Sequence, residues 1–291
     1  MAKFFWNLRH GRSHAGKNSD PERLCLIQDA LAMQEMFLKR KILGAPPDKE
    51  YQFLLFVEHN RTYVCTQKDQ ERMNELGDNA KLFRPDMASS NPPLYVLTEN
   101  RGGSITYHGP GQLTCYMILC EEEVGIKSPH QIATIIDEAI KDFLSEFAVT
   151  AYTTQELCKI TNPRIRENLI SHGLMNADSK NESSILMAAQ GVWVIDRDEA
   201  KKIASRGIRR VSHSYPDGTT KHFLKYGFAV NLSTELEYFD RIYPCGEDIQ
   251  MTTLEQIAQD CPPIHKAAPM MAEALIKSFR KFTKKESHKL I

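Results

Sequence analysis

Two short stretches of the chain combine residue types that could bind a ligand closely and attack it. The first is Arg101-Gly-Gly-Ser-Ile-Thr-Tyr-His108-Gly-Pro-Gly-Gln112, where four glycines and a proline in twelve residues do not fit an ordinary helix or strand. Glycines let a backbone approach a ligand, while Arg101 and His108 add a planar cation and a titratable donor. Taken alone, the stretch could also be a hairpin turn with a surface arginine.

The second stretch is Tyr243-Pro-Cys245-Gly246, which places a thiol between a φ-locked proline and a flexible glycine. A tight turn of this kind would expose the sulfur. A cysteine becomes a useful nucleophile when a nearby cation favours its thiolate, and Lys202 is a candidate for that cation. The alternative is a small buried cysteine at 245 and a solvated lysine at 202 beside Lys201.

Short runs rich in β-forming residues surround both stretches and predict strands that position them. These runs are residues 4–8, 53–58, 94–97, 114–119, 191–195 and 227–232. Apolar residues at helical spacing predict one helix that starts at Asp20 and includes Leu24 to Leu38, a second over 129–147, and a third over 268–283. The chain is therefore expected to be an α/β (α+β) protein with a mixed sheet flanked by helices.

Length alone would permit one large domain or two small ones; we expect one domain over residues 1–291, with its core at about 4–262. Polar, irregular segments near 153–184 and 210–225 are interpreted as surface insertions.

The composition argues against several classes of protein. The chain has 37 basic and 37 acidic residues, so no general field attracts nucleic acid or an anionic membrane. Seven cysteines without a C-x-x-C pair argue against a disulfide framework and a zinc ribbon.

Five motifs, in this order along the chain, resemble the lipoyl(octanoyl) transferase family. They are Glu58-His59 with Tyr63 and Thr66; Arg101 to Gln112, which matches R-G-G-x-x-T-x-H-G-P-G-Q; Gly191-Val-Trp-Val with Lys202-Ile203; Gly227-Phe-Ala229; and Pro244-Cys245-Gly246. The resemblance covers most of the chain. It implies a fold shared with biotin and lipoate protein ligases.

The resemblance also implies roles for matching positions. Cys245 would be the nucleophile that forms an acyl thioester, and Lys202 would favour its thiolate and relay protons. The residues implied to line the acyl pocket are Arg101, Gly102, Gly103, Ser104, Ile105, Thr106, Tyr107, His108, Ser205, Arg206, Gly207, Gly227, Phe228 and Ala229. Two positions depart from the family: Tyr226 stands where a histidine is usual, and Arg206 where a small or aliphatic residue is usual.

As a member of this family, the chain would be an acyltransferase of lipoate biosynthesis. It would move an octanoyl group from acyl carrier protein to a lysine of lipoyl domains, including the E2 subunits of 2-oxoacid dehydrogenases and the glycine cleavage H protein. An amide is more stable than a thioester, so this transfer requires no ATP, and no metal is expected. We expect a monomer that binds neither nucleic acid nor membrane.

Three other functions fit parts of the pattern. The first is an ATP-dependent lipoate protein ligase, which needs the lysine but no catalytic cysteine. The second is a lipoyl-domain binding protein without turnover, and the third is a cysteine hydrolase. The acid-free basic start, from Lys3 to Lys17, predicts the mitochondrial matrix for a eukaryotic protein, and the cytoplasm is predicted otherwise.

Overall fold

The structure is a computed structural model that describes residues 3–9, 24–44, 48–76, 82–84, 94–98, 104–172, 174–175, 190–246 and 248–288. Within these ranges, the side chains of residues 6–9, 94–98, 245 and 284–288 are not described. Among the described helices, none is long and apolar enough to cross a membrane.

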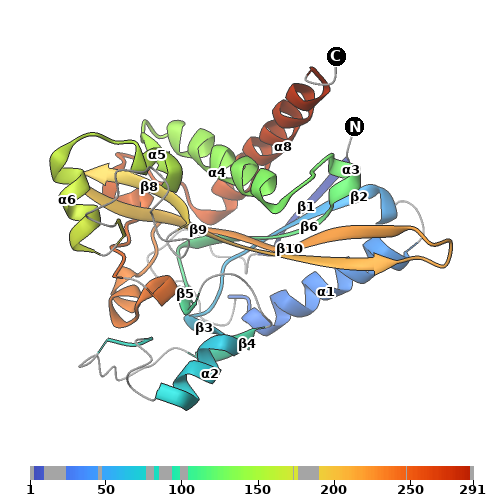
Figure 1. The fold of residues 1–291 in the computed structure, drawn as a ribbon, viewed down its shortest axis with the longest axis horizontal. Coiled ribbons are helices and arrows are strands. Elements are labelled where there is room, and N and C mark those ends of the chain that lie inside the picture. Colours follow the sequence, from blue (N-terminus) through green and yellow to red (C-terminus); the bar gives the residue numbers. More distant parts are fainter. Residues whose placement is uncertain are drawn as a thin grey trace.

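A large mixed sheet forms the centre of the fold (Figure 1). In sheet order, its strands are β1 (Lys3–Arg9), β2 (Tyr51–Val57), β6 (Gln112–Cys120), β10 (Thr220–Asn231), β9 (Glu199–Ser214), β8 (Gly191–Asp196) and β7 (Ala151–Thr153). The β1–β2 pair is parallel and the other neighbours are antiparallel. The predicted mixed sheet is confirmed, and so are the strands predicted near both chemical stretches.

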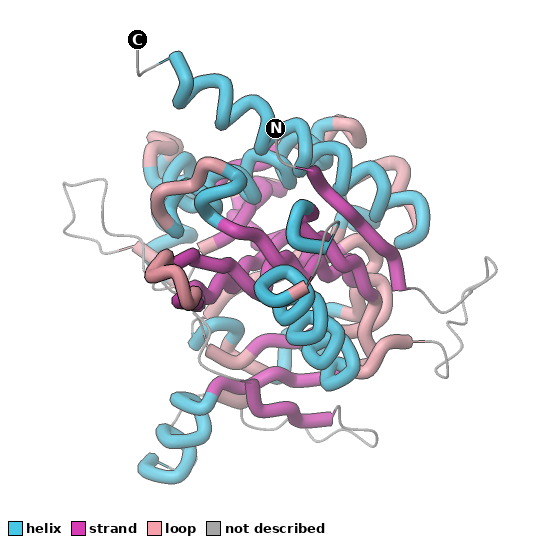
Figure 2. The backbone as a smooth tube through the Cα atoms, turned by 90° about the vertical axis from the view of Figure 1, so that its right-hand side faces the viewer, coloured by secondary structure: helices cyan, strands magenta, loops and turns pink. Residues whose placement is uncertain are grey.

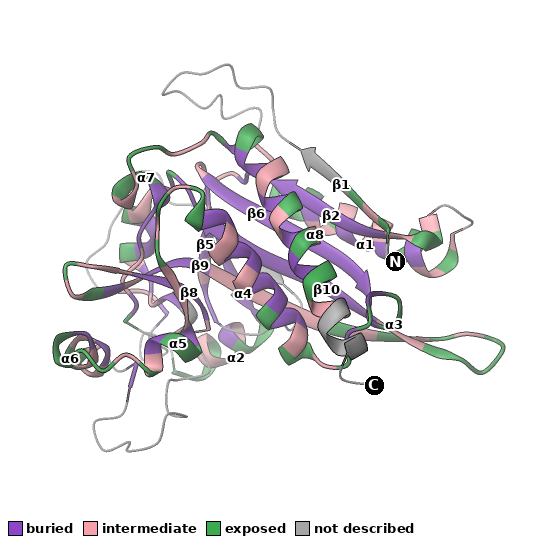
Figure 3. Ribbon diagram, turned by 90° about the horizontal axis from the view of Figure 1, so that it is seen from above, coloured by how far each residue is buried: buried purple, intermediate pink, exposed green. Residues whose placement is uncertain are grey.

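Two long helices cover one face of this sheet: α4 (Pro129–Ser145) and α8 (Ile264–His288) (Figure 3). In α4, Ile132, Ile136, Ala139 and Phe143 recur at helical spacing, and all four are buried in the main hydrophobic core. The second predicted helix is therefore confirmed. The third is also confirmed, although α8 extends beyond both predicted ends.

Helix α1 (Ile27–Leu43) covers the opposite face, where Ala30 and Leu38 pack against β2 and β6. The prediction that this helix starts at Asp20 is wrong, because residues 24–26 are not helical. Cys25 instead forms a parallel β-bridge with His59, and Leu26 is extended. The competing β-bridge explains why the helical spacing of Leu24 did not produce helix.

A smaller sheet lies on the same side as α1, as Figures 1 and 2 both show. Its strands, in order, are β4 (Leu94–Thr98), β3 (Thr62–Thr66) and β5 (Thr106–His108). Helix α2 (Gln67–Leu76) follows β3 directly, and Thr66 and Asp69 cap its start by exchanging hydrogen bonds. The remaining short elements are η2 (Asp48–Glu50), α3 (Glu121–Val124), α5 (Thr154–Cys158), α6 (Pro163–Ser171), η5 (Leu236–Arg241), η6 (Pro244–Gly246) and α7 (Leu254–Ile257).

The two segments interpreted as insertions have regular structure where they are described. The first contains α5 and α6, which pack on β8 and β9, while residues 176–184 lie outside the described part. In the second, residues 210–225 are not a loop. They form the outer half of the β9–β10 hairpin, in which only residues 215–219 make the turn.

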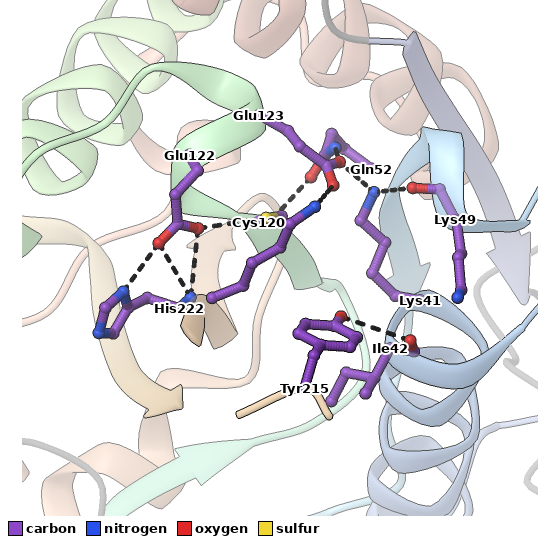
Figure 4. A network of polar contacts seen from close by, with 10 residues as sticks. Lys41, Ile42, Lys49, Gln52, Cys120, Glu122, Glu123, Tyr215 and His222 are labelled. Atoms are coloured by element: carbon purple, nitrogen blue, oxygen red, sulfur yellow. Dashed lines mark hydrogen bonds and ion pairs between the residues drawn. The ribbon is translucent and has the colours of Figure 1, made fainter. Parts of the chain in front are cut away.

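A polar cluster fastens this hairpin to the body of the protein (Figure 4). The Lys41 ammonium group, whose side chain is fully buried, donates to the Lys49 carbonyl and to the Glu123 carboxylate. Glu123 also accepts from Gln52 and from Lys221 of β10. His222 donates from its backbone to Glu122, which also bonds the imidazole. Burial alone would raise the pKa values of Glu122 and Glu123, but these hydrogen bonds lower them overall.

His59 connects the segment before α1, at Cys25, to the large sheet. Its ring is completely buried; Nδ1 donates to the Cys25 carbonyl (3.0 Å), and Nε2 accepts from the Tyr116 hydroxyl (3.0 Å). Burial lowers the pKa of His59 to about 4, against the smaller opposing effect of the Cys25 carbonyl. The ring is therefore neutral at physiological pH, which matches this pair of roles.

We expect Lys41→Met to lower the free energy of unfolding by about 2 kcal/mol, because it leaves the Lys49 carbonyl and part of Glu123 without a donor. The matched control is Lys39→Met on the exposed side of α1. Urea unfolding at neutral pH measures both. Equal stability of the two variants would contradict the assigned role of the cluster.

We expect His59 to make the fold sensitive to mild acid. The unfolded chain takes up this proton near pH 6.5, whereas the folded chain does so only near pH 4, so stability falls as the pH drops between these values. Between pH 7 and 4.5, the wild type should lose about 2 kcal/mol more than His59→Gln. Urea unfolding at both pH values provides the comparison. An equal loss of unfolding free energy in the wild type and in His59→Gln would show that His59 is not the responsible group.

Candidate active site

The face of the large sheet that looks toward α1 contains a patch of small side chains. Across strands, Ser205 faces Ala229 and Ala229 faces Thr114; in the next row, Gly207 faces Gly227 and Gly227 faces Tyr116. Tyr116 packs with Ala30 of α1, which identifies the face. Ser205, Gly207, Gly227 and Ala229 have small side chains or none, so an extended apolar chain can approach the sheet closely there, and the patch is a candidate floor for an acyl site.

Lys202 lies on β9, three residues before Ser205 of this floor. It is 1% exposed, and its ammonium group lies 5.8 Å from the centre of the Trp193 ring, its partner on β8. A Cβ atom on Gly191 would come within 2.6 Å of Lys202 Cε, so the glycine makes room for the lysine stem. Thr154 fixes this wall: its hydroxyl accepts from Trp193 Nε1 and from the Gly191 N–H, each at 3.1 Å.

The segment from Pro244 to Thr252 connects the cysteine turn with this lysine. At its start, Gly246 lies beside Ser104, since an added Cβ would be 3.9 Å from the serine Cβ. At its end, the Lys202 N–H donates to the Gln250 carbonyl (2.8 Å), and the Thr252 N–H donates to the Lys202 carbonyl (3.0 Å). Cys245 directly precedes Gly246, which lies beside the glycine-rich stretch, and four residues of the chain separate it from Gln250, which bonds the Lys202 backbone.

The glycine-rich stretch is anchored on both sides of β5. Before β5, the Ser104 hydroxyl donates to the buried Asp69 carboxylate at the start of α2 (2.5 Å). After β5, Gly111 has φ +76°, and a Cβ there would lie 2.4 Å from the Ser233 carbonyl oxygen. The Gly111 N–H donates to Glu58 (2.8 Å), so the Glu58-His59 motif holds this turn. Glycine is required at 111 by conformation and by space.

A chain of buried amides links His108 to the strand of Lys202. His108 Nδ1–H donates to Gln112 Oε1 (2.6 Å), Gln112 Nε2 donates to Asn231 Oδ1 (2.9 Å), and Asn231 Nδ2 donates to the Thr252 carbonyl (3.1 Å). Thr252 in turn bonds the Lys202 backbone. Because the Gln112 amide nitrogen is already donating, the proton of this bond belongs to His108 Nδ1. The chain fixes the tautomer of His108 and the position of Lys202 together.

The structure brings many of the predicted site residues to one region. Ser104, Thr106, His108, Lys202, Ser205, Gly207, Gly227 and Ala229 lie on the α1-facing floor, on β5 or just before it. Arg101, Gly102, Gly103 and the Cys245 side chain lie outside the described part of the structure.

Four predicted pocket residues point elsewhere. Arg206 forms a two-bond ion pair with Asp137 of α4, on the opposite face of the sheet, and Phe228 is buried in the core beneath α4 and α8. Ile105 and Tyr107 pack in a separate core, where Tyr107 stacks on Tyr238 of η5. Side chains alternate along strands, so consecutive motif residues cannot all face one ligand.

Sequence reasoning missed several residues that hold the site: Asp69, Thr154, Asn231 and Thr252. A signal existed for Asp69, since Thr66-Gln-Lys-Asp69 after a strand is typical of a helix capping box. No local pattern identified the others, because each acts on residues distant in sequence.

Comparison with known proteins places this geometry in a family. The model described as "Lipoyl protein ligase A/B catalytic domain" matches residues 27–276. An octanoyltransferase of Bacteroides fragilis is 28% identical over 205 residues, which cover 70% of each chain. One of Rickettsia peacockii is 27% identical over 219 residues, covering 72% of this chain and 76% of the other.

Solved structures of lower similarity also align with the chain. A bipartite lipoate protein ligase of Thermoplasma acidophilum aligns over 97% of this chain and 84% of that chain, with 9% identity and a TM-score of 0.45. A biotin protein ligase of Aquifex aeolicus aligns over 78% and 71%, with 13% identity and a TM-score of 0.37. The predicted family and the predicted acyltransferase class of enzyme are confirmed by the family match and by the curated relatives. Because the match spans most of its length, the chain belongs to the lipoyl protein ligase A/B catalytic domain family.

Proposed function

We propose that this protein transfers an octanoyl group from an acyl carrier protein thioester to a lysine of a lipoyl domain, with Cys245 holding the acyl group between the two steps. The observation that carries the proposal is that Gly246, next to Cys245, lies beside Ser104, while Gln250 and Thr252, a few residues on, bond the Lys202 backbone. The curated octanoyltransferases among the relatives support the choice of acyl group.

In the first step, the Cys245 thiolate attacks the carbonyl carbon of the donor thioester. A new carbon–sulfur bond forms, the bond to the donor sulfur breaks, and Lys202 gives a proton to the leaving thiolate. The buried lysine suits this work, because an ammonium group in a low-dielectric wall interacts strongly with an anionic sulfur.

In the second step, the acceptor lysine amine attacks the acyl-enzyme. The amide bond forms, the bond to the Cys245 sulfur breaks, and Lys202 takes up the proton that the amine loses. The cycle returns Lys202 to its ammonium form and Cys245 to its thiolate. An amide replaces a thioester, so the reaction runs downhill without ATP, and the two proposed steps use no metal ion.

The partners follow from the two steps. The donor is octanoyl-phosphopantetheine on acyl carrier protein, and the acceptors are lipoyl domains of 2-oxoacid dehydrogenase E2 subunits and the glycine cleavage H protein. We propose that the enzyme acts as a monomer. The relatives named above are bacterial, so they do not bear on the mitochondrial matrix, which stays a prediction for a eukaryotic protein, with the cytoplasm for a bacterial one.

The test is intact mass spectrometry after incubation with octanoyl acyl carrier protein and no ATP. We expect a hydroxylamine-labile octanoyl adduct on the wild type, none on Cys245→Ser, and formation slowed by about 100-fold in Lys202→Ala. The slower rate reflects loss of the group that favours the thiolate and protonates the leaving thiol.

Another cysteine and another lysine of the chain serve as controls. Burial raises the pKa of Cys261 to about 11, so Cys261→Ser should leave adduct formation unchanged. Lys201 pairs with Asp196 and Glu199, so Lys201→Ala should also react normally. If the wild type forms no adduct but makes octanoyl adenylate when ATP is added, the protein is a ligase. Binding of a lipoyl domain without either product would indicate the inactive binding protein.

A further inference from the structure

Tyr226 has a backbone conformation that aromatic residues seldom adopt. Its φ is +67°, in the left-handed region that glycine and asparagine tolerate best. It lies inside β10, next to Gly227, rather than in a turn. An outlier of this kind persists only where the surrounding structure imposes it, and such outliers gather at functional sites.

The left-handed residue changes which face of the sheet receives the ring. Leu224 and Phe228 both point into the core beneath α4, so regular alternation would direct the Tyr226 side chain there as well. The pairing of β10 with β6 is interrupted at Lys225 and Tyr226, and the tyrosine ring instead joins the cluster of Ala30 and Tyr116 on the α1 side. Two consecutive side chains, Lys225 and Tyr226, therefore lie on that face.

Gly227 makes this arrangement possible. A Cβ atom on Gly227 would lie 1.9 Å from the Cys115 carbonyl oxygen, so the backbone passes too close to β6 for any other residue. Lys225 then covers the redirected ring: its ammonium group lies 5.5 Å from the ring centre and pairs with Glu35 of α1. The ring is held from both sides and is 7% exposed.

The redirected ring lies at one end of the floor of small side chains. From Lys202, the floor continues through the Ser205–Ala229 row and then the Gly207–Gly227 row, which are about 7 Å apart along the strands. Tyr226 follows directly after the second row and packs against Leu55 and Tyr116. An acyl chain that starts near Lys202 and extends over the small residues therefore meets this ring.

We propose that Tyr226 is the specificity-determining residue that closes the far end of the acyl site and sets the longest chain that the enzyme accepts; this inference rests on the proposed acyl transfer. The ring acts by its volume, and the left-handed backbone keeps it across the floor. Its hydroxyl group is not required for the selectivity.

The experiment measures acyl-enzyme formation with octanoyl-, decanoyl- and dodecanoyl-pantetheine, which bypass any requirement for a carrier protein. The ring is removed in Tyr226→Gly and Tyr226→Asn, two residues that accept a φ of +67°, and it is kept in Tyr226→Phe. Phe223→Leu, on the same strand and face but packed in another cluster, is the matched control.

The expected result is a rise of at least about tenfold in the dodecanoyl-to-octanoyl rate ratio for the glycine and asparagine variants, since four more methylenes can then be buried. Tyr226→Phe and Phe223→Leu should keep the wild-type ratio. Active variants without the ring and with an unchanged ratio would overturn the inference and leave the acyl transfer intact. A wild type that forms no acyl-enzyme with any chain would overturn both.

Discussion

The burial of the Lys202 ammonium group is the constraint that organises the site. A charged group removed from water is costly unless the protein surrounds it with compensating charge, dipoles or an aromatic face. Here the lysine lies over the Trp193 ring, Gly191 leaves space for its stem, and Thr154 fixes both of those residues. Thr154, the first residue of α5, thereby fixes one wall of the site through Trp193 and Gly191.

The second constraint is that the glycine-rich stretch around His108 and the strand of Lys202, which are distant in sequence, must keep a fixed relative position. The chain of hydrogen bonds from the half-buried His108 through the buried Gln112 and Asn231 provides it, because each bond fixes the next. Gly207, Gly227 and Ala229 then form a floor of small side chains between these fixed edges. A rigid frame around a surface of small side chains suits selective binding of an apolar chain.

Much of this could be predicted from the sequence, because the chemistry is encoded in contiguous motifs. The strands around residues 114 and 227, the helix over 129–147 and the Lys202 position follow from local patterns. What could not be predicted depends on partners far along the chain. Because Cys25 forms a β-bridge with His59, α1 begins only at Ile27. Pairing of β9 with β10 extends both strands through residues 210–225, which were expected to form a surface insertion.

The orientation of single side chains was harder still. A bulge between β8 and β9 near Val192 and Trp193 shifts the alternation along β9, and the left-handed Tyr226 shifts it along β10. Neither irregularity has a local sequence signal. For that reason, the motif around Ser205 includes Arg206, which points to α4, and the motif around Gly227 includes Phe228, which points into the core.

The central claim is that the buried Lys202 ammonium group keeps Cys245 in its thiolate form, and alkylation tests it most directly. The rate at which iodoacetamide modifies Cys245, followed by peptide mass mapping from pH 5.5 to 9, should be high already at pH 6.5 in the wild type. Lys202→Met should lower the rate at pH 6.5 by at least about tenfold while leaving the rate at pH 9 nearly unchanged. Identical pH profiles for the two proteins would contradict the account.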